Sequence, residues 1–462
     1  NVENNNPDIK IENSDMEIKL PYQSNDEIAI VGVAGRYPLA DSVEEYWDNL
    51  VEGRNCITEI PKERWDLKGF YDATSNEHGK SYSKWGGFIK DIDKFDADFF
   101  GISEGLASEM DPQERIFLEL TWHLLEDAGY PYHSLSSKGY RTGVFCGVMY
   151  GTYGTMGTVL SEQGIYTGAQ SSYWLIPNRV SHYFNFNGPS FSIDSACSSS
   201  LTAIHLACES IKRGECDTAV VGGINLILSP RHFLRLSNLK NLSSSDETKT
   251  FGSGADGFVV GEGAGAILLK PLSKAIQDND KIYGVVKGSF INSTGNSGGF
   301  MAPNPVSQAN LIEEALKKSG VDPRTISYIE AHGTGTILGD PVEISGLTKT
   351  FRKFTLEKQF CAIGSVKSNI GHLEAAAGIS ALTKILMQMK YKKLVPSLHA
   401  GEVNPYIKFE DTPFYLQKTL SDWNAPIIEG KLYPRRAGVS SFGAGGANAH
   451  LIVEEYLENE GE

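Results

Sequence analysis

Short apolar runs alternate with amphipathic stretches along most of the chain, and this pattern predicts an α/β protein. Apolar runs of strand length lie at residues 28–33, 189–193, 218–228, 263–269, 282–291, 326–329 and 361–365, and a strand pair is expected around 440–454. Helices are expected from residue 112, from residue 197, over 308–319 and over 373–390. The last of these is apolar nearly all round, so we expect it to be buried.

Two of these helices carry explicit start signals. Before the first, Asp111 fits an N-cap, Pro112 fits the first helical position and Glu114 completes a capping box. The second is expected to start at Cys197 and to bury an apolar stripe that includes Cys208. Because a strand is expected just before it, Cys197 should lie at a strand-to-helix turn.

Composition and charge exclude several classes of function. The 462 residues carry a formal net charge of −15, and 48 of them are glycine, which fits tight strand-to-helix turns. An acidic chain without clustered Lys and Arg argues against nucleic acid as a partner. No apolar run approaches the roughly 20 residues that span a bilayer, and the polar start is unlike a signal peptide, so no membrane partner is expected.

Cysteine spacing and local composition indicate how the chain is organised. The six cysteines form no CxxC pair and no Cys/His metal spacing, so we expect reduced thiols, no bound metal and a cytoplasmic location. Residues 1–26 are Asn-rich, charged and aperiodic, which predicts a flexible linker. One domain is expected over 27–455, in halves of roughly 27–280 and 281–455, followed by a tail at 456–462.

Cys197 is the candidate nucleophile, because it lies in the run DSACSSS. Unpaired N–H groups and the dipole at a helix N-terminus favour a thiolate, and the small neighbours permit a tight turn that leaves access for a substrate. Such a thiol is a good acyl acceptor. A buried structural cysteine is the commoner alternative, and that is the interpretation we give to Cys208.

Two histidines lie in distinctive runs in the second half of the chain. His332 lies in EAHGTGT, whose hydroxyls suit a polar thioester arm, and His372 lies in KSNIGHLEAAAG. A neutral imidazole can donate a hydrogen bond to a carbonyl oxygen that is becoming an enolate. A site that joins both to Cys197 should lie between the halves. The remaining histidines are expected to be structural, among them His123, His133, His205, His232, His399 and His450.

Glycine-rich runs invite two further interpretations. The runs at 252–257 and 261–265 superficially suggest a nucleotide loop, but a strand rather than a helix is expected next, so no nucleotide cofactor is predicted. The run SSFGAGGANAH at 440–450 exposes backbone N–H groups, one of which suits an oxyanion hole. A tight turn is the equal alternative for that run.

Three motifs in this order, DSACSSSL, EAHGTGT and KSNIGHLEAAAG, resemble those of the β-ketoacyl synthase (ketosynthase) domains of modular polyketide synthases. Supporting runs are IAIVGVAGRYP, FFGIS, MDPQER, ADGFVVGEG and SSFGAGGANAH, so the resemblance covers residues 27–455. GAGGANAH, FCGVMYG and FGSGADGFV are most similar to the branch whose acyltransferases act in trans. The resemblance implies an α/β, thiolase-like fold of five layers, αβαβα, made of two similar halves, and a homodimer.

The resemblance also implies roles for individual residues. Cys197 resembles the acyl-accepting nucleophile, His332 and His372 the pair that assists decarboxylation, and Lys367 the lysine that orders the site. The remaining expected roles are the backbone oxyanion hole (Cys197, Ala444), contacts to the phosphopantetheine arm (Thr334, Thr336), a supporting polar network (Asp340, Glu343) and an acyl pocket (Met149, Tyr150, Tyr173, Trp174). Packing is an equal alternative for the three aromatic residues. Many relatives carry Phe where Ala444 stands, so the closing of the pocket is expected to differ.

The implied reaction is a decarboxylative condensation between an acyl chain on Cys197 and a malonyl-type carrier thioester. Expected partners are an acyl carrier protein, which supplies the phosphopantetheine, and neighbouring polyketide synthase domains; the domain itself is expected to bind no cofactor. The flanking linker domain that would follow is absent from this sequence. The alternative is a non-elongating gatekeeper or docking domain, which typically lacks the histidine of EAHGTGT. A thiolase would need a late cysteine, and none follows Cys361.

Overall fold

The computed structural model describes residues 27–74, 79–296 and 298–458 of the chain. The flexible linker expected at residues 1–26, and residues 459–462 of the expected tail, lie outside these ranges.

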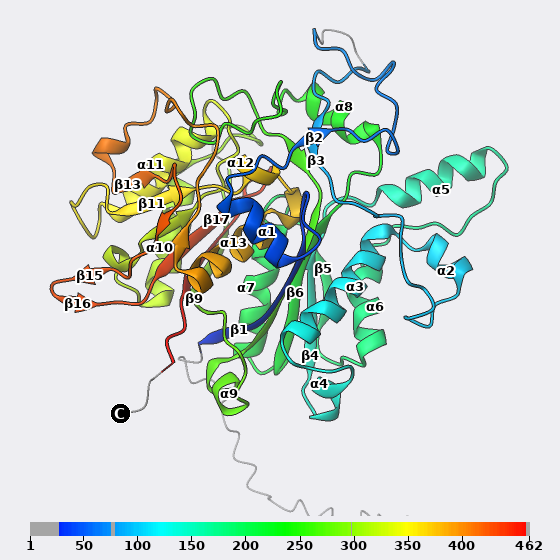
Figure 1. The fold of residues 1–462 in the computed structure, drawn as a ribbon, viewed down its shortest axis with the longest axis horizontal. Coiled ribbons are helices and arrows are strands. Elements are labelled where there is room, and N and C mark those ends of the chain that lie inside the picture. The colour runs from blue at the N-terminus through cyan, green and yellow to red at the C-terminus, as the bar shows by residue number, and fades with distance from the viewer. Residues whose placement is uncertain (1–26, 75–78, 297, 459–462) are drawn as a thin grey trace, which may run out of the picture.

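The strands of the first half form one side of a large sheet (Figure 1). In spatial order they are β1 (Ile28–Arg36), β8 (Gly263–Pro271), β6 (Thr218–Asn225), β4 (Thr142–Gly147) and β5 (Ser190–Ile193). β8 runs antiparallel to β1 and β6, whereas β4 is parallel to β6 and β5. β5 therefore ends the sheet on this side, and the carboxyl ends of β4 and β5 lie at the same edge.

The second half repeats this arrangement. Its strands lie in the order β9 (Gly284–Ser293), β18 (Ala447–Glu454), β17 (Arg436–Phe442), β10 (Tyr328–Glu330) and β11 (Cys361–Gly364), with β13 (Phe414–Leu416) outermost. When β13 is left out and the five remaining strands of each half are numbered along the chain, both halves follow the spatial order 1-5-4-2-3. The parallel and antiparallel pairs are also the same in both halves. This confirms the expected fold of two similar halves, which join where β1 pairs with β9.

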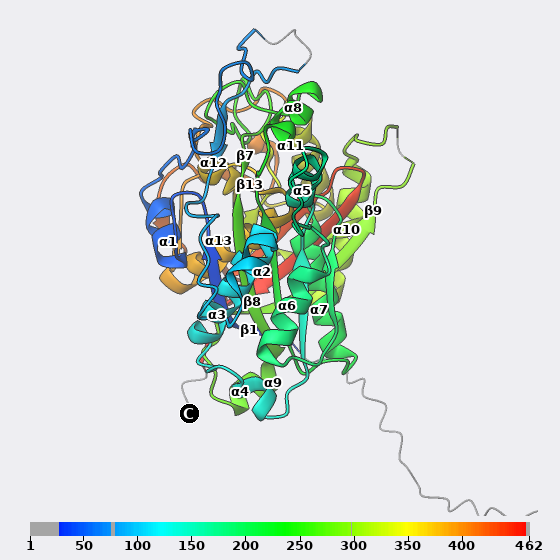
Figure 2. The same cartoon turned by 90° about the vertical axis from the view of Figure 1, so that its right-hand side faces the viewer.

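Helices form the other three layers. In the middle, α7 (Ser199–Lys212) packs against β4, β6 and β18, and α13 (Ala377–Tyr391) packs against β8 and β17, so both contact strands of each half. α3 (Pro112–Asp127) and α6 (Leu175–Phe184) cover the outer face of the first half, in front of its strands in Figure 2. α10 (Pro305–Ser319) covers the second half, with α11 (Gly339–Phe351) beside it. The order of layers is αβαβα.

The expected start of α3 is confirmed, but the capping box is wrong. The Asp111 side chain accepts the backbone N–H of Gln113 at 2.9 Å, and Pro112 occupies the first helical position. Glu114 does not reach back to the cap, because its carboxyl accepts a hydrogen bond from the Nε of Arg179 on α6 at 2.7 Å. The side chain expected to cap α3 instead ties it to its neighbour in the outer layer.

Two further helix starts differ from the expectation. α7 begins at Ser199 rather than at Cys197, because the chain first makes a tight turn with Ala196 at φ +56°. His372 does not open a long helix either. It follows the short α12 (Lys367–Ile370), from which Gly371 at φ +77° turns the chain, and precedes a 3-10 turn, η2 (Glu374–Ala376), that leads into α13. α13 is buried from Ala377 to Met389, as its apolar sequence predicts.

The remaining elements surround this core, and α5 projects from it at the right of Figure 1. The helices are α1 (Val43–Val51), α2 (Glu104–Glu109), α4 (Ser134–Ser137), α5 (Thr152–Glu162), α8 (Pro230–Asn238), α9 (Leu272–Gln277), η1 (Pro323–Thr325) and η3 (Phe409–Asp411). The short strands are β2 (Thr58–Glu59), β3 (Trp85–Gly87), β7 (Val260–Gly261), β12 (Lys393–Leu394), β14 (Ser421–Asp422), β15 (Ile427–Ile428) and β16 (Lys431–Leu432).

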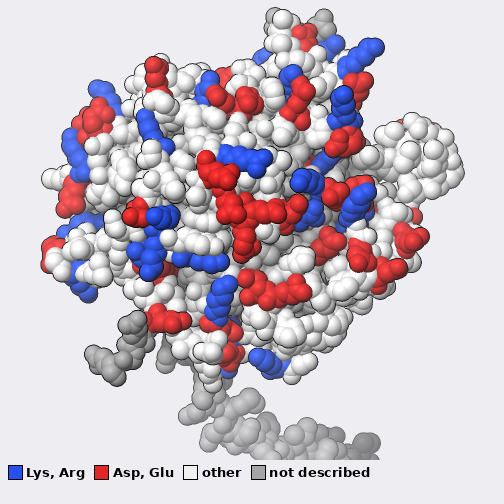
Figure 3. All heavy atoms as spheres, in the orientation of Figure 1, with Lys and Arg blue, Asp and Glu red and all other residues white. Residues whose placement is uncertain are grey.

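The surface reflects the acidic composition of the chain. On the face seen in Figure 3, acidic side chains gather near α1 at the centre, and Lys and Arg are scattered around them. Within the described ranges, no helix combines the length and the apolar character needed to cross a bilayer.

Candidate active site

Cys197 lies at the top of a strained turn between β5 and α7. Ala196, just before it, has a left-handed backbone at φ +56°, which a non-glycine residue adopts only when its surroundings hold it there. The serines of the motif supply that hold. The Oγ of Ser199 donates to the carbonyl of Ala196 at 2.6 Å, and the Oγ of Ser198 donates to the carbonyl of Ser195 at 2.8 Å. These two hydroxyls therefore fix the backbone of the turn that carries the thiol.

The turn between β17 and β18 brings a second backbone segment against the sulfur. The N–H groups of Ala444 and of Cys197 itself both face the thiol and favour its charged form. This close approach needs glycine at 443, because a Cβ there would lie 2.3 Å from the carbonyl oxygen of Ser195. Two backbone N–H groups thus lie next to the sulfur, and their role as an oxyanion hole stays a prediction.

Burial controls the ionisation of the thiol. It raises the pKa of Cys197 to about 12, and the nearby Glu374 raises it further, whereas Ala444 N–H and Lys367 act to lower it. The sequence led us to expect a thiolate stabilised by a helix N-terminus. The helix starts two residues later and burial disfavours the charged form, so the structure instead indicates a neutral thiol at rest.

His332 and His372 meet each other beside this turn. His332 follows β10, and its backbone N–H donates to the Glu343 carboxyl at 2.7 Å. His372 is anchored by its own N–H, which donates to the carbonyl of Val259 at 2.7 Å. The two imidazole rings lie with their centroids 5.4 Å apart and their planes at 88°.

The protonation of this pair follows from its surroundings. Burial lowers the pKa of His332 and of His372 well below the ordinary range, and the Lys367 ammonium lowers both further. Both rings are therefore neutral. The Nδ1 of His372 accepts the backbone N–H of Glu374 at 3.2 Å, so its single proton is assigned to Nε2. His372 is consequently a hydrogen-bond donor through Nε2.

Asp340 and Glu343 shape the loop that carries His332. Glu343 accepts the N–H groups of His332 and Gly333, at 2.7 and 2.8 Å, and Asp340 accepts those of Gly335 and Phe251, at 3.1 and 2.7 Å. Burial raises the pKa of each carboxyl to about 7. The two acidic residues thus hold the HGTGT backbone through three hydrogen bonds, and a fourth joins it to Phe251.

One cavity of about 210 Å³ collects most of these groups. The expected residues in its wall are Cys197, His332, His372, Thr334, Thr336, Asp340, Glu343 and Ala444. Phe258 and Phe442 complete the aromatic part of the wall, each against one imidazole, at centroid separations of 4.9 Å from His372 and 5.5 Å from His332. The thiol, the two neutral imidazoles and the two backbone donors therefore face a common space.

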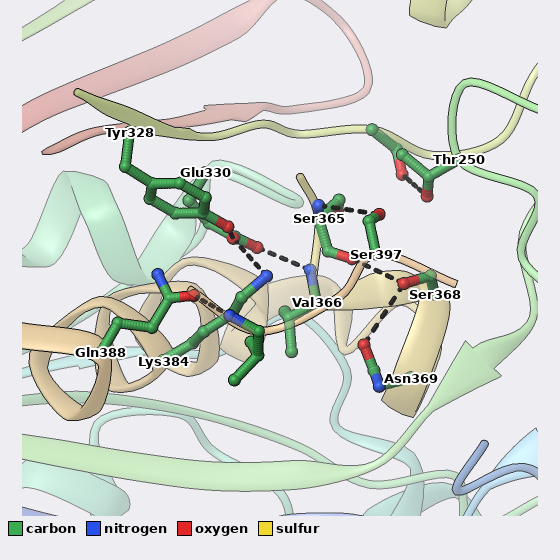
Figure 4. Close-up of polar contacts among 12 residues, drawn as sticks. Thr250, Tyr328, Glu330, Ser365, Val366, Ser368, Asn369, Lys384, Gln388 and Ser397 are labelled. Atoms are coloured by element: carbon green, nitrogen blue, oxygen red, sulfur yellow. Dashed lines mark hydrogen bonds and ion pairs between the residues drawn. The ribbon is translucent and has the colours of Figure 1, made fainter. Parts of the chain in front are cut away.

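Lys367 is buried next to this cavity, and a second lysine is buried behind it. Burial lowers the pKa of Lys367, while Glu330 and Glu343 oppose that shift. Figure 4 shows Glu330 between the Nζ of Lys384, at 2.8 Å, and the backbone N–H of Val366, which donates to it at 2.6 Å. Tyr328 donates its hydroxyl to the same carboxyl at 2.5 Å. Through its hydrogen bond with Val366, Glu330 ties the end of β10 to the turn that carries Lys367.

The residues expected to line an acyl pocket separate in the structure. Tyr150 borders a larger cavity of about 730 Å³ between α5 and α8. Tyr173 donates its hydroxyl to the carbonyl of Met149 at 2.8 Å, and Trp174 is 58% exposed. Neither of the two cavities has Met149, Tyr173 or Trp174 in its wall. Of the four, Tyr150 borders a cavity, and the acyl-pocket roles of all four residues stay predictions.

Sequence reasoning missed a polar cluster next to the thiol. The Glu374 carboxyl lies 2.8 Å from the Nε2 of His232 and accepts from Asn225 at 3.3 Å and from the Tyr150 hydroxyl at 3.4 Å. His232 was expected to be a structural residue. Glu374 lies in KSNIGHLEAAAG and Glu330 in EAHGTGT, so the signal was present, but neither glutamate was predicted to have a role.

Other expectations about single residues hold. His450 is buried and bonds through Nδ1 to the Ser440 hydroxyl at 2.9 Å, and burial lowers its pKa to about 3, so it is structural. His205 is likewise buried, next to Ser289. Cys208 belongs to the hydrophobic core.

A two-halved αβαβα fold with a thiol at a strained strand-to-helix turn and two neutral histidines opposite it defines a thiolase-like condensing enzyme. The chain matches the beta-ketoacyl synthase N-terminal domain over residues 25–275 and the beta-ketoacyl synthase C-terminal domain over residues 283–401. It therefore belongs to the β-ketoacyl synthase family, which is a family of acyltransferases.

Relatives and solved structures agree with this assignment. The chain is 56% identical to polyketide synthase PksM and 54% identical to polyketide synthase PksL, both of Bacillus subtilis, over 94% of its own length. It spans about a tenth of the length of these relatives, 10% of each. The oxazolomycin ketosynthase domain OzmH KS7 of Streptomyces albus is 49% identical with a TM-score of 0.92, covering 95% of this chain and 76% of that one.

The ketosynthase from module 6 of the bacillaene synthase of Bacillus subtilis is 44% identical with a TM-score of 0.86, over 94% of this chain and 72% of that one. The chain is thus a ketosynthase domain of the polyketide synthase type.

Proposed function

We propose that this domain is an elongating ketosynthase of a modular polyketide synthase whose acyltransferase acts in trans. The observation that carries the proposal is the shared cavity, where Cys197, His332 and His372 face one another and two backbone N–H groups face the sulfur. A domain that only transfers or binds acyl chains has no use for a pair of neutral imidazole donors. The presence of both histidines in productive proximity therefore favours elongation over the gatekeeper alternative.

The first step loads the acyl chain. The sulfur of Cys197 attacks the carbonyl carbon of an acyl thioester on a carrier protein, while the N–H groups of Cys197 and Ala444 hold the oxyanion. The carbon–sulfur bond to the carrier then breaks. The carrier thiol leaves with the proton that the Cys197 thiol gives up, so the exchange of one thiol for another is balanced. A neutral resting thiol is compatible with this exchange.

The second step extends the chain. A malonyl-type carrier thioester places its thioester carbonyl between His332 and His372, which donate hydrogen bonds as the bond to the carboxylate breaks and CO₂ leaves. The resulting enolate attacks the acyl carbonyl on Cys197, the bond to sulfur breaks, and the thiolate takes up one proton. The product is a β-ketoacyl carrier thioester, two carbons longer than the loaded chain.

The partners follow from this chemistry. Thr334 and Thr336 in the cavity wall suit the amide-rich phosphopantetheine of an acyl carrier protein, which delivers both substrates. Because the chain spans a tenth of its relatives, the neighbouring domains of a polyketide synthase are its natural covalent partners. The domain itself needs no bound cofactor or metal for these steps. The free cysteines fit a reducing compartment such as the cytoplasm.

We also propose a homodimer formed through β5. This strand ends the sheet on one side, and its Phe191 is 40% exposed. An edge strand with an exposed aromatic side chain invites pairing with another strand, and the same edge on a second copy satisfies twofold symmetry. Light scattering on the purified chain should give twice its mass, and Phe191→Lys should shift it toward the monomer.

The decisive test combines intact-mass analysis with product analysis. The wild type, loaded with an acyl chain and supplied with a malonyl carrier protein, should release CO₂ and form product two carbons longer. Cys197→Ala should neither load nor extend. Loading without extension would overturn the elongating role and leave the gatekeeper alternative.

A further inference from the structure

Next to Cys197 lies a polar cluster that the two proposed steps do not use. It consists of Glu374, His232, Asn225 and Tyr150, which come from η2, α8, the end of β6 and the segment after β4. Glu374 is 3% exposed and Asn225 is fully buried. Glu374 also has a left-handed backbone at φ +47°. Burying a carboxyl on a left-handed backbone beside the nucleophile costs free energy of folding, and packing alone does not explain that cost.

The cluster borders the larger cavity. Tyr150 and His232 both line the cavity of about 730 Å³, and their rings contact each other at a centroid separation of 4.5 Å. On the other side, the Glu374 carboxyl raises the pKa of the Cys197 thiol, and both Glu374 and Cys197 add to the raised pKa of Tyr150. The cluster is therefore near both the thiol and the larger cavity.

The cluster has more hydrogen-bonding capacity than its own contacts use. The Tyr150 hydroxyl donates to Glu374 over a long 3.4 Å, and Asn225 donates to it at 3.3 Å. The His232 Nε2 lies 2.8 Å from the carboxyl but at an angle too poor for a hydrogen bond. The Oδ1 of Asn225 is likewise buried without an aligned partner in the described part of the chain. These are loose contacts that a ligand group can improve.

The rest of the larger cavity is also partly polar. Thr152, Thr155 and Gln163 line it from α5 and the residue after it, and Arg231 and Arg235 line it from α8. The guanidinium of Arg235 lies 5.9 Å from the centre of the Tyr150 ring. A purely hydrocarbon chain would leave these groups without partners, whereas an oxygenated chain would satisfy some of them.

We propose that this cluster selects acyl chains that carry a hydroxyl group within a few carbons of the thioester. A hydroxyl is both a donor and an acceptor, so it can donate to the Glu374 carboxyl and accept from Tyr150 or His232. A ketone at the same position only accepts, and it would face the carboxyl without a proton to offer. The inference rests on the proposed function, because it assumes that Cys197 carries the chain.

The test measures loading of Cys197 by intact mass with N-acetylcysteamine thioesters of three matched chains: butyryl, 3-hydroxybutyryl and 3-oxobutyryl. The wild type should load 3-hydroxybutyryl about tenfold faster than either of the others, as one hydrogen bond to a charged group allows. Equal rates for the hydroxylated and plain chains would overturn the inference and indicate that water alone occupies the cluster. A preference for the ketone would overturn it as well.

Two variants locate the preference. Tyr150→Phe and Glu374→Gln keep the shape of the cluster and should each reduce the ratio of hydroxylated to plain loading toward one. Tyr153→Phe is the matched control: its hydroxyl donates to the carbonyl of Ser108, it lies outside both cavities, and its removal should leave the ratio unchanged. A ratio unaffected by Tyr150→Phe and Glu374→Gln would overturn the assignment to these residues.

The outcomes for the two proposals are distinct. Loading of all three chains at one rate, with extension intact, removes only the hydroxyl preference. Failure of every chain to load on Cys197, in a protein that is folded by circular dichroism, removes the proposed function itself.

Discussion

The rings of His332 and His372 stand almost perpendicular, at 88°, with their centroids 5.4 Å apart. Because the rings are perpendicular, an N–H of each imidazole can point at the same small group without a clash between the two rings. Lys367 and burial keep both rings neutral, so each has one proton to donate. The pair therefore suits an oxygen that gains negative charge during the reaction.

Replacing either histidine should separate the two steps. His332→Ala and His372→Ala should each slow CO₂ release by about 10²–10³, because one donor to the enolate oxygen is lost. Loading of Cys197 should persist in both variants. His123→Ala, on the exposed surface of α3, is the control and should leave CO₂ release unchanged. Carboxyl loss at the wild-type rate in both variants would contradict the assigned role.

The raised pKa of Cys197 predicts how its alkylation depends on pH. With a pKa of about 12, the thiolate fraction is small at neutral pH and grows about tenfold per pH unit, so the rate of modification by iodoacetamide should still rise between pH 8 and 10. The other five cysteines are buried, and Cys197→Ser should abolish the reaction. A rate that reaches a plateau near pH 7 would instead support a thiolate stabilised by the helix N-terminus.

Gly443 should be intolerant of a side chain. In Gly443→Ala the new Cβ would lie 2.3 Å from the Ser195 carbonyl oxygen and 3.1 Å from the Ser198 hydroxyl, so the β17–β18 turn must move away from the sulfur. A displacement of about 1 Å can reduce a rate by roughly 10²-fold, and we expect that loss in the loading of Cys197. Gly105→Ala on α2 meets no atom within 4 Å and should load normally. Unimpaired loading by a folded Gly443→Ala would contradict the oxyanion hole.

The buried pair of Glu330 and Lys384 should matter more for stability than any surface pair. Lys384→Met leaves a fully buried carboxyl without its cation and should lower the free energy of unfolding by about 3–5 kcal/mol. The double variant Lys384→Met/Glu330→Gln removes both charges and should recover part of that loss. Lys353→Met breaks an exposed pair with Glu313 and should cost less than about 1 kcal/mol. Urea denaturation of the four proteins provides the comparison, and equal losses in both single variants would contradict it.

His450 should make the domain less stable as pH falls. Burial lowers its pKa from 6.5 to about 3, so between these values the unfolded chain binds a proton that the folded chain does not. Stability from this residue is therefore present above pH 6.5 and is lost as pH falls, by about 2 kcal/mol at pH 5. His450→Gln lacks this titration, so its free energy of unfolding should fall less between pH 7.5 and 5. Asp340 and Glu343 shift in the opposite sense but act equally in both proteins.

Much of the site could be predicted from the sequence because its parts lie in contiguous motifs. Cys197, His332 and His372 each stand in a run whose glycines and hydroxyls fix the local turn, and the burial of α13 follows from its continuous apolar sequence. β4 was not predicted, since TGVFCG is short and bounded by glycine. Local patterns thus predicted the reactive residues better than they predicted the full set of strands in the sheet.

Properties that depend on distant packing were not predictable. The neutral state of the Cys197 thiol reflects burial and the nearby Glu374 carboxyl, which no local pattern reveals. The contact between His232 and Glu374 was also unpredictable, because α8 and η2 come from different halves of the chain. A lone histidine gave no signal of a partner so far along the sequence. The capping box predicted at Glu114 was wrong for the same reason, because the Glu114 carboxyl binds Arg179 on another helix instead of the backbone at the helix start.

The repeated strand order of the two halves places a different set of reactive residues after the same two strands of each half. In the first half, the second and third strands lead into Tyr150 and Cys197, and in the second half the equivalent strands lead into His332 and His372. On the proposed mechanism, the first half supplies the nucleophile and most of the cluster that meets the growing chain, whereas the second half activates the extender unit and adds Glu374. An evolving assembly line can therefore change the chain it accepts through Tyr150 and His232, while the histidine pair that drives decarboxylation stays the same.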